Sequence, residues 1–290
     1  MGKISFDEIS NSKALFNALS KALEEIFEQG EVQSIAFFII EKEFGLDRTR
    51  VLADYPVNMD KVHALGHILD RLRANEPVQY ILGETEFFDL TFKVNPTVLI
   101  PRPETEELVS LIIRENKHKQ NLKIMDIGTG SGCIAISLAK NLPQSDVYAL
   151  DIDEDTLQTA QTNADLNMVK ISTIHGDILK DEILKVFPKP DVIVSNPPYV
   201  RQLEKVEMEK NVLEHEPEKA LFVPDNQPLL FYERITKLAS EKLMSGGKLY
   251  FEINEAFGPE TKKLLLENGF KDVEVFQDMQ GKDRMTKAIK

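Results

Sequence analysis

The chain has 290 residues, 42% of them hydrophobic, which is enough to bury a core in one large domain beside a smaller one. Asp and Glu outnumber Lys and Arg by 48 to 35, and the formal net charge of −13 disfavours stable binding to a phosphate backbone. The single cysteine, Cys133, excludes an intrachain disulfide and indicates a reducing compartment. With no signal-peptide core and no apolar run able to span a bilayer, we expect a cytoplasmic protein without membrane contact.

The first 75 residues predict a small helical bundle. Apolar residues recur at helical spacing, for example between Ala14 and Ile26. The tripeptide Asn75-Glu76-Pro77 ends the pattern, so we place the boundary of a helical domain, residues 1–75, at this point. The predicted helices run from the capping-box residues Ser5 and Glu8 to Gly30, from Val32 to Phe44 before Gly45, briefly from Asp47, and from Met59 to Ala74.

Residues 76–103 differ in character and predict a linker that contains a β-hairpin. Beta-prone residues from Phe87 to Leu99 flank the dipeptide Asn95-Pro96, which suits the turn between two strands. The stiff tripeptide Pro101-Arg102-Pro103 then leads into a third region, residues 104–290.

In residues 104–290, strands alternate with helices, which predicts an α/β fold: a doubly wound, mostly parallel sheet covered by helices on both faces. Two last strands, Val273–Gln277 and Arg284–Ile289, predict an antiparallel hairpin at the sheet edge. The other predicted strands are Lys123–Ile127, Val147–Leu150, Ile171–Ile174, Val192–Ser195 and Lys248–Ile253. The predicted helices are Glu104–Lys117, Gly132–Asn141, Glu154–Leu166, Pro228–Met244 and Glu260–Asn268.

A glycine-rich turn follows the first of these strands. Glycines let a backbone approach a ligand closely, and three alternating glycines exceed what a ligand-free strand-to-helix turn needs. The spacing fits neither the dinucleotide fingerprint nor a P-loop. The pattern D-x-G-x-G-x-G from Asp126 instead resembles motif I of class I methyltransferases, which use S-adenosylmethionine. The resemblance implies a cofactor loop formed by Gly128, Thr129, Gly130, Ser131 and Gly132.

The same resemblance assigns further residues to the cofactor. Asp151 ends the next strand, where this class places the acidic residue that binds the ribose, and a carboxylate can accept hydrogen bonds from both hydroxyls of a diol. The alternative for Asp151 is a helix N-cap, although Asp153 is better placed for that. Asp177 and Ile178 match the positions that face the adenine amine and pack on its ring, and an ordinary Gly-Asp loop is the alternative.

The strand Val192–Ser195 ends in Asn196-Pro197-Pro198-Tyr199, at the edge where parallel sheets bind ligands. An amide or aryl amine nitrogen is a poor nucleophile because its lone pair is delocalised. If the Asn196 oxygen and a proline carbonyl accept hydrogen bonds from the target NH2, these bonds strengthen as the nitrogen becomes positive. We therefore predict Asn196, Pro197 and Tyr199 as catalytic, with Tyr199 stacking on the planar target. We further predict that Pro198 belongs to the substrate site and that Asn196 also contacts the cofactor. The alternative for the tetrapeptide is a proline-stiffened turn without a catalytic role.

Motifs spread over the chain resemble the PrmC or HemK family of protein-glutamine methyltransferases, which modify class I peptide release factors. These motifs are Glu76–Gly83 followed by Glu86-Phe87, Leu99–Glu106, Asn196–Val200, Glu216-Pro217 with Ala220-Leu221, and Gly246-Gly247. The resemblance runs from Pro77 to the C-terminus, whereas the first seventy residues match only as a helical domain. It implies methyl transfer from S-adenosylmethionine, leaving S-adenosylhomocysteine, to the glutamine amide nitrogen of a Gly-Gly-Gln motif, modulating translation termination. The helical domain would help to grip the release factor.

Two rival functions remain open from the sequence. The tetrapeptide also occurs in methyltransferases that act on the adenine exocyclic amine of DNA or RNA, and a non-catalytic cofactor-binding module could retain the glycine loop. We expect a monomer without stable nucleic-acid binding and without a metal site, because His63 and His67 lack the glutamate of H-E-x-x-H. The acidic run from Glu204 to Glu218 is either a solvated face or a rim that receives a basic partner.

Overall fold

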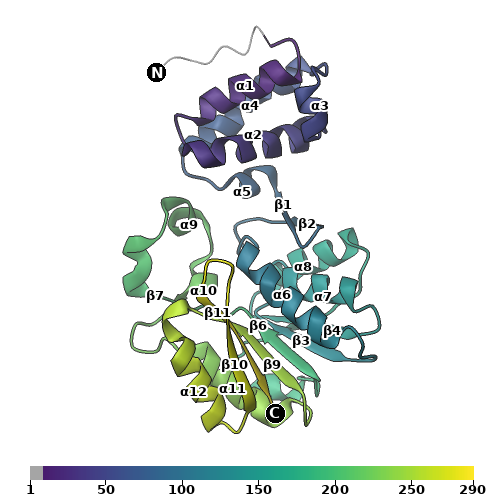
Figure 1. Cartoon of the computed structure of the whole chain (residues 1–290), viewed down its shortest axis with the longest axis vertical. Helices are drawn as coiled ribbons and strands as arrows, with labels where there is room; N and C mark the ends of the chain where they lie inside the picture. Colours follow the sequence, from purple (N-terminus) through teal and green to yellow (C-terminus); the bar gives the residue numbers. More distant parts are fainter. Residues whose placement is uncertain (1–8) are drawn as a thin grey trace. The chain divides into compact units, whose positions relative to one another are not determined.

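The computed structural model describes residues 9–290, which form two units (Figure 1). One unit comprises residues 9–83 together with Lys210–His215, and the other comprises Glu84–Glu209 and Glu216–Lys290. The predicted capping box at Ser5 and Glu8 lies outside the described residues.

The first unit is a bundle of helices around an apolar core, and α5 belongs to it because Val78, Ile81 and Leu82 pack against that core. Asn11 caps the first helix by accepting a hydrogen bond from Ala14 N at 2.8 Å. The prediction that Gly30 ends this helix is wrong. Gly30 is the second residue of α2. The backbone N–H groups of a first helical turn have no partner within the helix, so a glycine there does not end a helix. The helices are α1 (Ser12–Leu23), α2 (Gln29–Phe44), α3 (Arg48–Leu52), α4 (Met59–Arg73), α5 (Val78–Leu82) and α9 (Lys210–His215).

A two-stranded antiparallel hairpin opens the second unit. Its turn is Phe88-Asp89, with φ of 51° and 58°, and not Asn95-Pro96 as the sequence suggested. Two successive left-handed residues match the twist of a tight hairpin, although an Asn-Gly pair is the usual signal for such a turn. Phe87 and Phe92 lie in the core of this unit with their rings edge to face, 6.0 Å apart. The strands are β1 (Glu84–Phe87) and β2 (Leu90–Lys93).

The second unit is built on a seven-stranded sheet with the order β10-β11-β9-β6-β3-β4-β5. The five strands from β9 to β5 are parallel, and β11 is antiparallel to both of its neighbours. The predicted class is therefore confirmed: a doubly wound, mostly parallel sheet that ends in an antiparallel hairpin. The strands are β3 (Lys123–Ile127), β4 (Asp146–Asp151), β5 (Ser172–His175), β6 (Val192–Ser195), β9 (Lys248–Glu252), β10 (Lys271–Gln277) and β11 (Asp283–Ile289).

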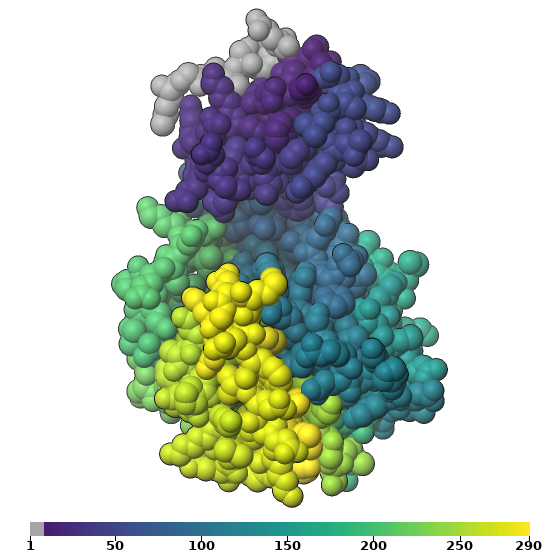
Figure 2. All heavy atoms as spheres, in the orientation of Figure 1, coloured from purple at the N-terminus to yellow at the C-terminus, as the bar shows by residue number. Residues whose placement is uncertain are grey.

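Helices cover both faces of this sheet because successive strand residues point to opposite sides. Ile124 packs with the core beneath α6, α7 and α8, whereas the next residue, Met125, packs with the core beneath α11 and α12. The yellow surface in Figure 2 belongs to α12 and to the terminal hairpin, whose turn, residues 279–282, is exposed. The helices are α6 (Pro103–Asn116), α7 (Cys133–Asn141), α8 (Glu154–Leu166), α11 (Leu230–Lys242) and α12 (Gly258–Glu267).

Short elements complete the second unit, most of them after β6. They are the 3-10 helices η1 (Asp181–Lys185), η2 (Gln202–Glu207) and η3 (Glu255–Phe257), the helix α10 (Glu218–Leu221), and the paired strands β7 (Val200–Arg201) and β8 (Phe222–Val223). Within residues 9–290, none of the helices has the length and hydropathy needed to cross a membrane.

The order of the strands fixes where a ligand can bind. The chain proceeds from β3 to β4 and β5 on one side, and then returns to place β6 on the other side of β3. Loops that leave the carboxyl ends of β3 and β6 therefore diverge, and the crevice between them is the usual ligand site of such sheets.

Candidate active site

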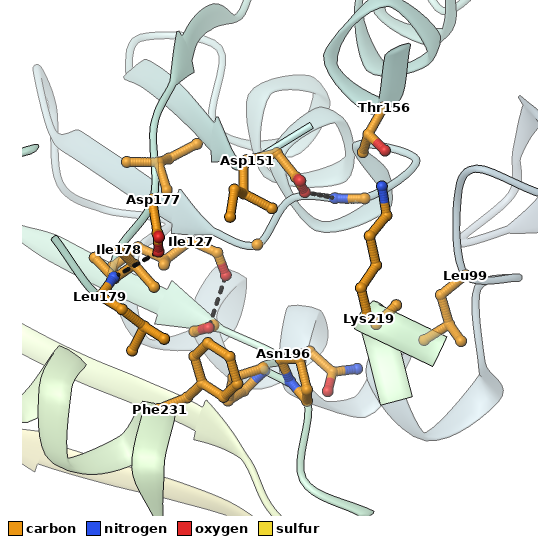
Figure 3. Close-up of a pocket in the computed structure, with 18 of the residues that line it drawn as sticks. Leu99, Ile127, Asp151, Thr156, Asp177, Ile178, Leu179, Asn196, Lys219 and Phe231 are labelled. Carbon is orange, nitrogen blue, oxygen red and sulfur yellow. Dashed lines mark hydrogen bonds between the residues drawn. The ribbon is translucent and has the colours of Figure 1, made fainter. Parts of the chain in front are cut away.

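A cavity of about 270 Å³ lies beyond the carboxyl ends of β3, β4, β5 and β6 (Figure 3). Most of the residues that the sequence assigned to a site line this one cavity, although they come from four separate loops. They are Gly128, Gly130, Asp151, Asp177, Ile178, Asn196, Pro197 and Pro198.

Two glycines of the loop after β3 expose their backbone to the cavity. Gly128 and Gly130 have φ of 73° and 55°, in the left-handed region that favours glycine. A Cβ added at either residue would meet no atom within 4 Å, so the space beside them is open to a ligand. The loop is fixed to the neighbouring strand β4, because Gly128 N and Thr129 N both donate to Leu150 O, at 2.8 and 2.9 Å.

The other three loop residues do not line the cavity. The Thr129 hydroxyl donates to the buried Asp126 at 2.7 Å, and burial raises the pKa of Asp126 to about 7. Ser131 O accepts a hydrogen bond from Asn163 Nδ2 at 2.9 Å. A Cβ on Gly132 would lie 2.9 Å from Ile136 and 3.1 Å from Ala160, so this glycine permits α7 to pack against α8. These residues support the loop from behind.

The carboxylate of Asp151 faces the cavity from the end of β4, on the opposite side from Asn196 (Figure 3). Its oxygens accept hydrogen bonds from Gly130 N at 3.0 Å and Asp153 N at 3.2 Å. Burial raises its pKa, and those two N–H groups partly offset the shift. Each carboxylate oxygen has two lone pairs, so both can still accept from a ligand. The N-cap of α8 is Asp153, which accepts from Thr156 N at 2.9 Å.

Asp177 and Ile178 occupy the loop after β5. Asp177 accepts a hydrogen bond from Leu179 N at 2.9 Å, while Ile178 is buried within the apolar core beneath α11. Two other residues that line the cavity, Phe231 of α11 and Lys219 of α10, were not predicted from the sequence. Both come from helices that follow β6 in the chain. Lys219 lies between the motif residues Pro217 and Ala220, and Phe231 lies in none of the motifs.

Asn196 lines both this cavity and a smaller neighbouring one, which Tyr199, Arg102 and Glu252 also line. The Tyr199 hydroxyl donates to Glu252 at 3.2 Å, and burial raises the pKa of Tyr199. Tyr199 N donates to Leu221 O, also at 3.2 Å. The tetrapeptide therefore spans two adjoining hollows, with Asn196 at their junction.

Two buried residues that the sequence did not single out contact the tetrapeptide. Asn196 Nδ2 donates to the Thr105 hydroxyl at 3.3 Å, and that hydroxyl donates to Glu252 Oε2 at 2.6 Å. Thr105 and Glu252 are 2% and 1% exposed. Burial raises the pKa of Glu252, while hydrogen bonds from Thr105 and Tyr199 and the charge of Arg284 act in the opposite direction. Thr105 does lie within the Leu99–Glu106 motif, which is the one sequence signal for this network.

An ion pair joins the two segments that enclose this region. Arg102 donates to Glu216 Oε1 at 2.5 Å, and Ile100 N donates to Glu216 Oε2 at 3.3 Å. The Glu216 side chain is buried, so this member of the acidic run belongs to neither a solvated face nor a rim. Glu204 and Glu218 of the same run pair with Arg201 and Lys205.

The strand order of the sheet, the glycine loop after β3 and the cavity beside it are those of the class I methyltransferase fold. The fold is shared with the 16S rRNA N2 G1207 methyltransferase of T. thermophilus, solved with AdoMet and guanosine. The TM-score is 0.52 at 19% identity, over 71% of this chain and 49% of that chain.

Sequence comparisons narrow this class to one family. Residues 15–83 match the PrmC N-terminal domain, and residues 105–221 match the Methyltransferase small domain. A release factor glutamine methyltransferase of Flavobacterium psychrophilum is 51% identical over 92% of this chain and 95% of its own. Another from Bacteroides thetaiotaomicron is 45% identical, over 93% of this chain and 97% of its own. The chain belongs to the release factor glutamine methyltransferase family, as its motifs predicted.

Proposed function

We propose that this methyltransferase transfers a methyl group from S-adenosylmethionine to the glutamine side-chain nitrogen in the Gly-Gly-Gln motif of class I peptide release factors. It would act in the cytoplasm and modulate translation termination. One observation carries the proposal: Asn196, an amide side chain suited to bind an NH2 group, lies in the same cavity as a glycine loop and a ribose-type carboxylate. The names and high coverage of the relatives support the choice of substrate.

The residues around the cavity fit the cofactor. Asp151 would accept hydrogen bonds from the ribose hydroxyls, and Ile178 and Phe231 offer apolar surface for the adenine. The open backbone at Gly128 and Gly130 leaves room for the methionine part. S-adenosylmethionine supplies a methyl group already activated by its sulfonium, so the protein's task is to hold and aim the acceptor.

Asn196 and Pro197 would aim the acceptor nitrogen. The Asn196 Oδ1 and the Pro197 carbonyl would each accept one N–H of the glutamine amide, which turns its lone pair toward the methyl group. As the nitrogen becomes positive, its N–H groups become stronger donors, so both contacts stabilise the transition state more than the ground state. The ring of Tyr199, held by its hydrogen bond to Glu252, would pack on the planar amide.

Locating the transferred methyl group tests the proposal. The enzyme is incubated with a recombinant class I release factor and isotopically labelled cofactor, and peptide mass spectrometry then identifies the labelled residue. We expect label on the glutamine of the Gly-Gly-Gln motif. A release factor with alanine in place of that glutamine is the matched control and should stay unlabelled. Label on DNA or RNA oligonucleotides, or equal label on the control, would refute the proposed substrate.

A further inference from the structure

We propose that Thr105 and Glu252 are positioning residues that set the orientation of the Asn196 amide and strengthen its oxygen as an acceptor. This inference rests on the proposed function, in which that oxygen binds the substrate NH2 group. Three elements bring the residues together: Thr105 lies in α6, Glu252 ends β9, and Asn196 follows β6.

The direction of each hydrogen bond follows from the groups involved. An ionised carboxylate has only acceptors, so the short contact of 2.6 Å between Thr105 and Glu252 uses the single proton of the threonine hydroxyl. The hydroxyl then offers only lone pairs to its other neighbour, and Asn196 must present its NH2 group there, at 3.3 Å. The Asn196 oxygen is thereby turned away from Thr105.

This orientation matters because the two ends of an amide are nearly identical in shape and differ only in their hydrogen-bonding character. A flipped Asn196 would present its own NH2 group to the NH2 group of the substrate, and no hydrogen bond would form. A flipped Asn196 would also turn its oxygen toward the Thr105 hydroxyl, whose proton is already donated to Glu252. Thr105 and Glu252 are only 2% and 1% exposed, so water cannot supply the lost hydrogen bond there. The buried pair therefore selects the productive orientation.

The same series of hydrogen bonds links the reacting nitrogen to a buried carboxylate. It runs from the reacting nitrogen through Asn196 and Thr105 to the carboxylate of Glu252, and Tyr199 donates to the other oxygen of that carboxylate. Hydrogen bonds in series polarise one another inside a protein. As positive charge develops on the nitrogen, the chain becomes stronger, so its loss should lower kcat more than it changes KM.

The test compares Thr105→Val with Thr105→Ser. Valine keeps the volume of threonine but lacks the hydroxyl, whereas serine keeps the hydroxyl. We expect Thr105→Val to lower kcat on the release factor by about tenfold, a size typical of residues that orient a functional side chain. KM for both substrates should change less than twofold, and Thr105→Ser should restore kcat to within about twofold of the wild type. Equal kcat values for the two variants would overturn the proposal.

A second measurement separates positioning from general destabilisation. If Thr105 acts through Asn196, Thr105→Val should cost nothing further when it is added to Asn196→Ala, in single-turnover assays with labelled cofactor. Additive losses would refute the proposal that Thr105 acts through Asn196. Calorimetric affinity for S-adenosylhomocysteine checks that Thr105→Val is folded. Glu252→Gln retains an oxygen that can accept from Thr105 and loses only the charge, so its kcat should fall less than that of Thr105→Val. Failure of the wild-type enzyme to label the glutamine would instead overturn the proposed function. The positioning roles of Thr105 and Glu252 would then fall with it.

Discussion

The two sides of the cavity are built in different ways. On the side that we propose for the cofactor, Asp151 accepts hydrogen bonds from backbone groups of its own loop and of the neighbouring glycine loop. On the side that we propose for methyl transfer, Asn196 is held by the side chain of Thr105, which is 91 residues away in the sequence. The first side depends on backbone conformation and the second on buried side chains, so substitutions should affect binding on one side and turnover on the other.

The largest effect is expected on the transfer side. Asn196→Ala should reduce turnover about a hundredfold or more, because it removes one preorganised contact to the transition state. Affinity for S-adenosylhomocysteine should remain largely intact, as measured by titration calorimetry. Near-normal turnover would remove Asn196 from its assigned role and erase the contrast between the two sides.

Asp151→Ala should have the opposite profile. Loss of a charged acceptor should weaken cofactor affinity by about 1.5–3 kcal/mol, read by calorimetry. Asp153→Ala is the matched control, since Asp153 caps α8 and pairs with Lys219. It should lower stability by about 1 kcal/mol, and because its partner Lys219 lines the cavity, it should weaken affinity only slightly compared with Asp151→Ala. If both variants weakened binding equally, Asp151 would have no special role.

Two glycines of one loop sharpen the comparison further. Gly132→Ala should destabilise the fold by about 2 kcal/mol, because it adds a clash with Ile136 and Ala160 to the strain of a φ of 82°. Gly130→Ala carries only the strain, so it should cost less stability while weakening cofactor binding. Thermal melting and calorimetry together check this pair, and the reverse ranking of stabilities would contradict it.

The smallest effect concerns a carboxylate remote from the cavity. Glu115 is partly desolvated, but hydrogen bonds from Lys248, Tyr250 and Lys287 dominate and lower its pKa to about 2. A carboxylate whose pKa is lowered by folding stabilises the folded state at pH values above its pKa in the unfolded chain, about 4.3. This contribution is lost as the pH falls toward 2. Glu115→Gln should therefore lower the free energy of unfolding by about 1 kcal/mol at pH 7, after allowance for solvent screening.

Urea denaturation at several pH values checks this prediction. The stability difference between wild type and Glu115→Gln should shrink between pH 5 and pH 2. A constant difference would show that the amide disturbs packing and that the charge of Glu115 contributes nothing. Glu252 provides the contrast, because burial raises its pKa and the hydrogen bonds from Thr105 and Tyr199 offset that rise only in part.

The sequence predicted those parts of the fold and site that depend on short segments. The strands of the sheet follow from runs of apolar residues, and the glycine loop and the tetrapeptide each follow directly after a strand. Thr105 and Glu252 could not be paired in this way, because they are 147 residues apart and each alone resembles an ordinary helix or strand residue. The Phe88-Asp89 turn was missed because a bulky residue rarely takes a positive φ, so its composition did not signal a turn.

The ion pair between Arg102 and Glu216 has a consequence for ligand entry. It links the segment that carries Leu99 to the segment that carries Ala220, and both of these residues line the cavity. Because Glu216 is buried and also accepts Ile100 N, contacts within the chain itself hold the two walls together. A preformed wall loses little conformational freedom when it is filled, so more of the contact energy is retained as affinity.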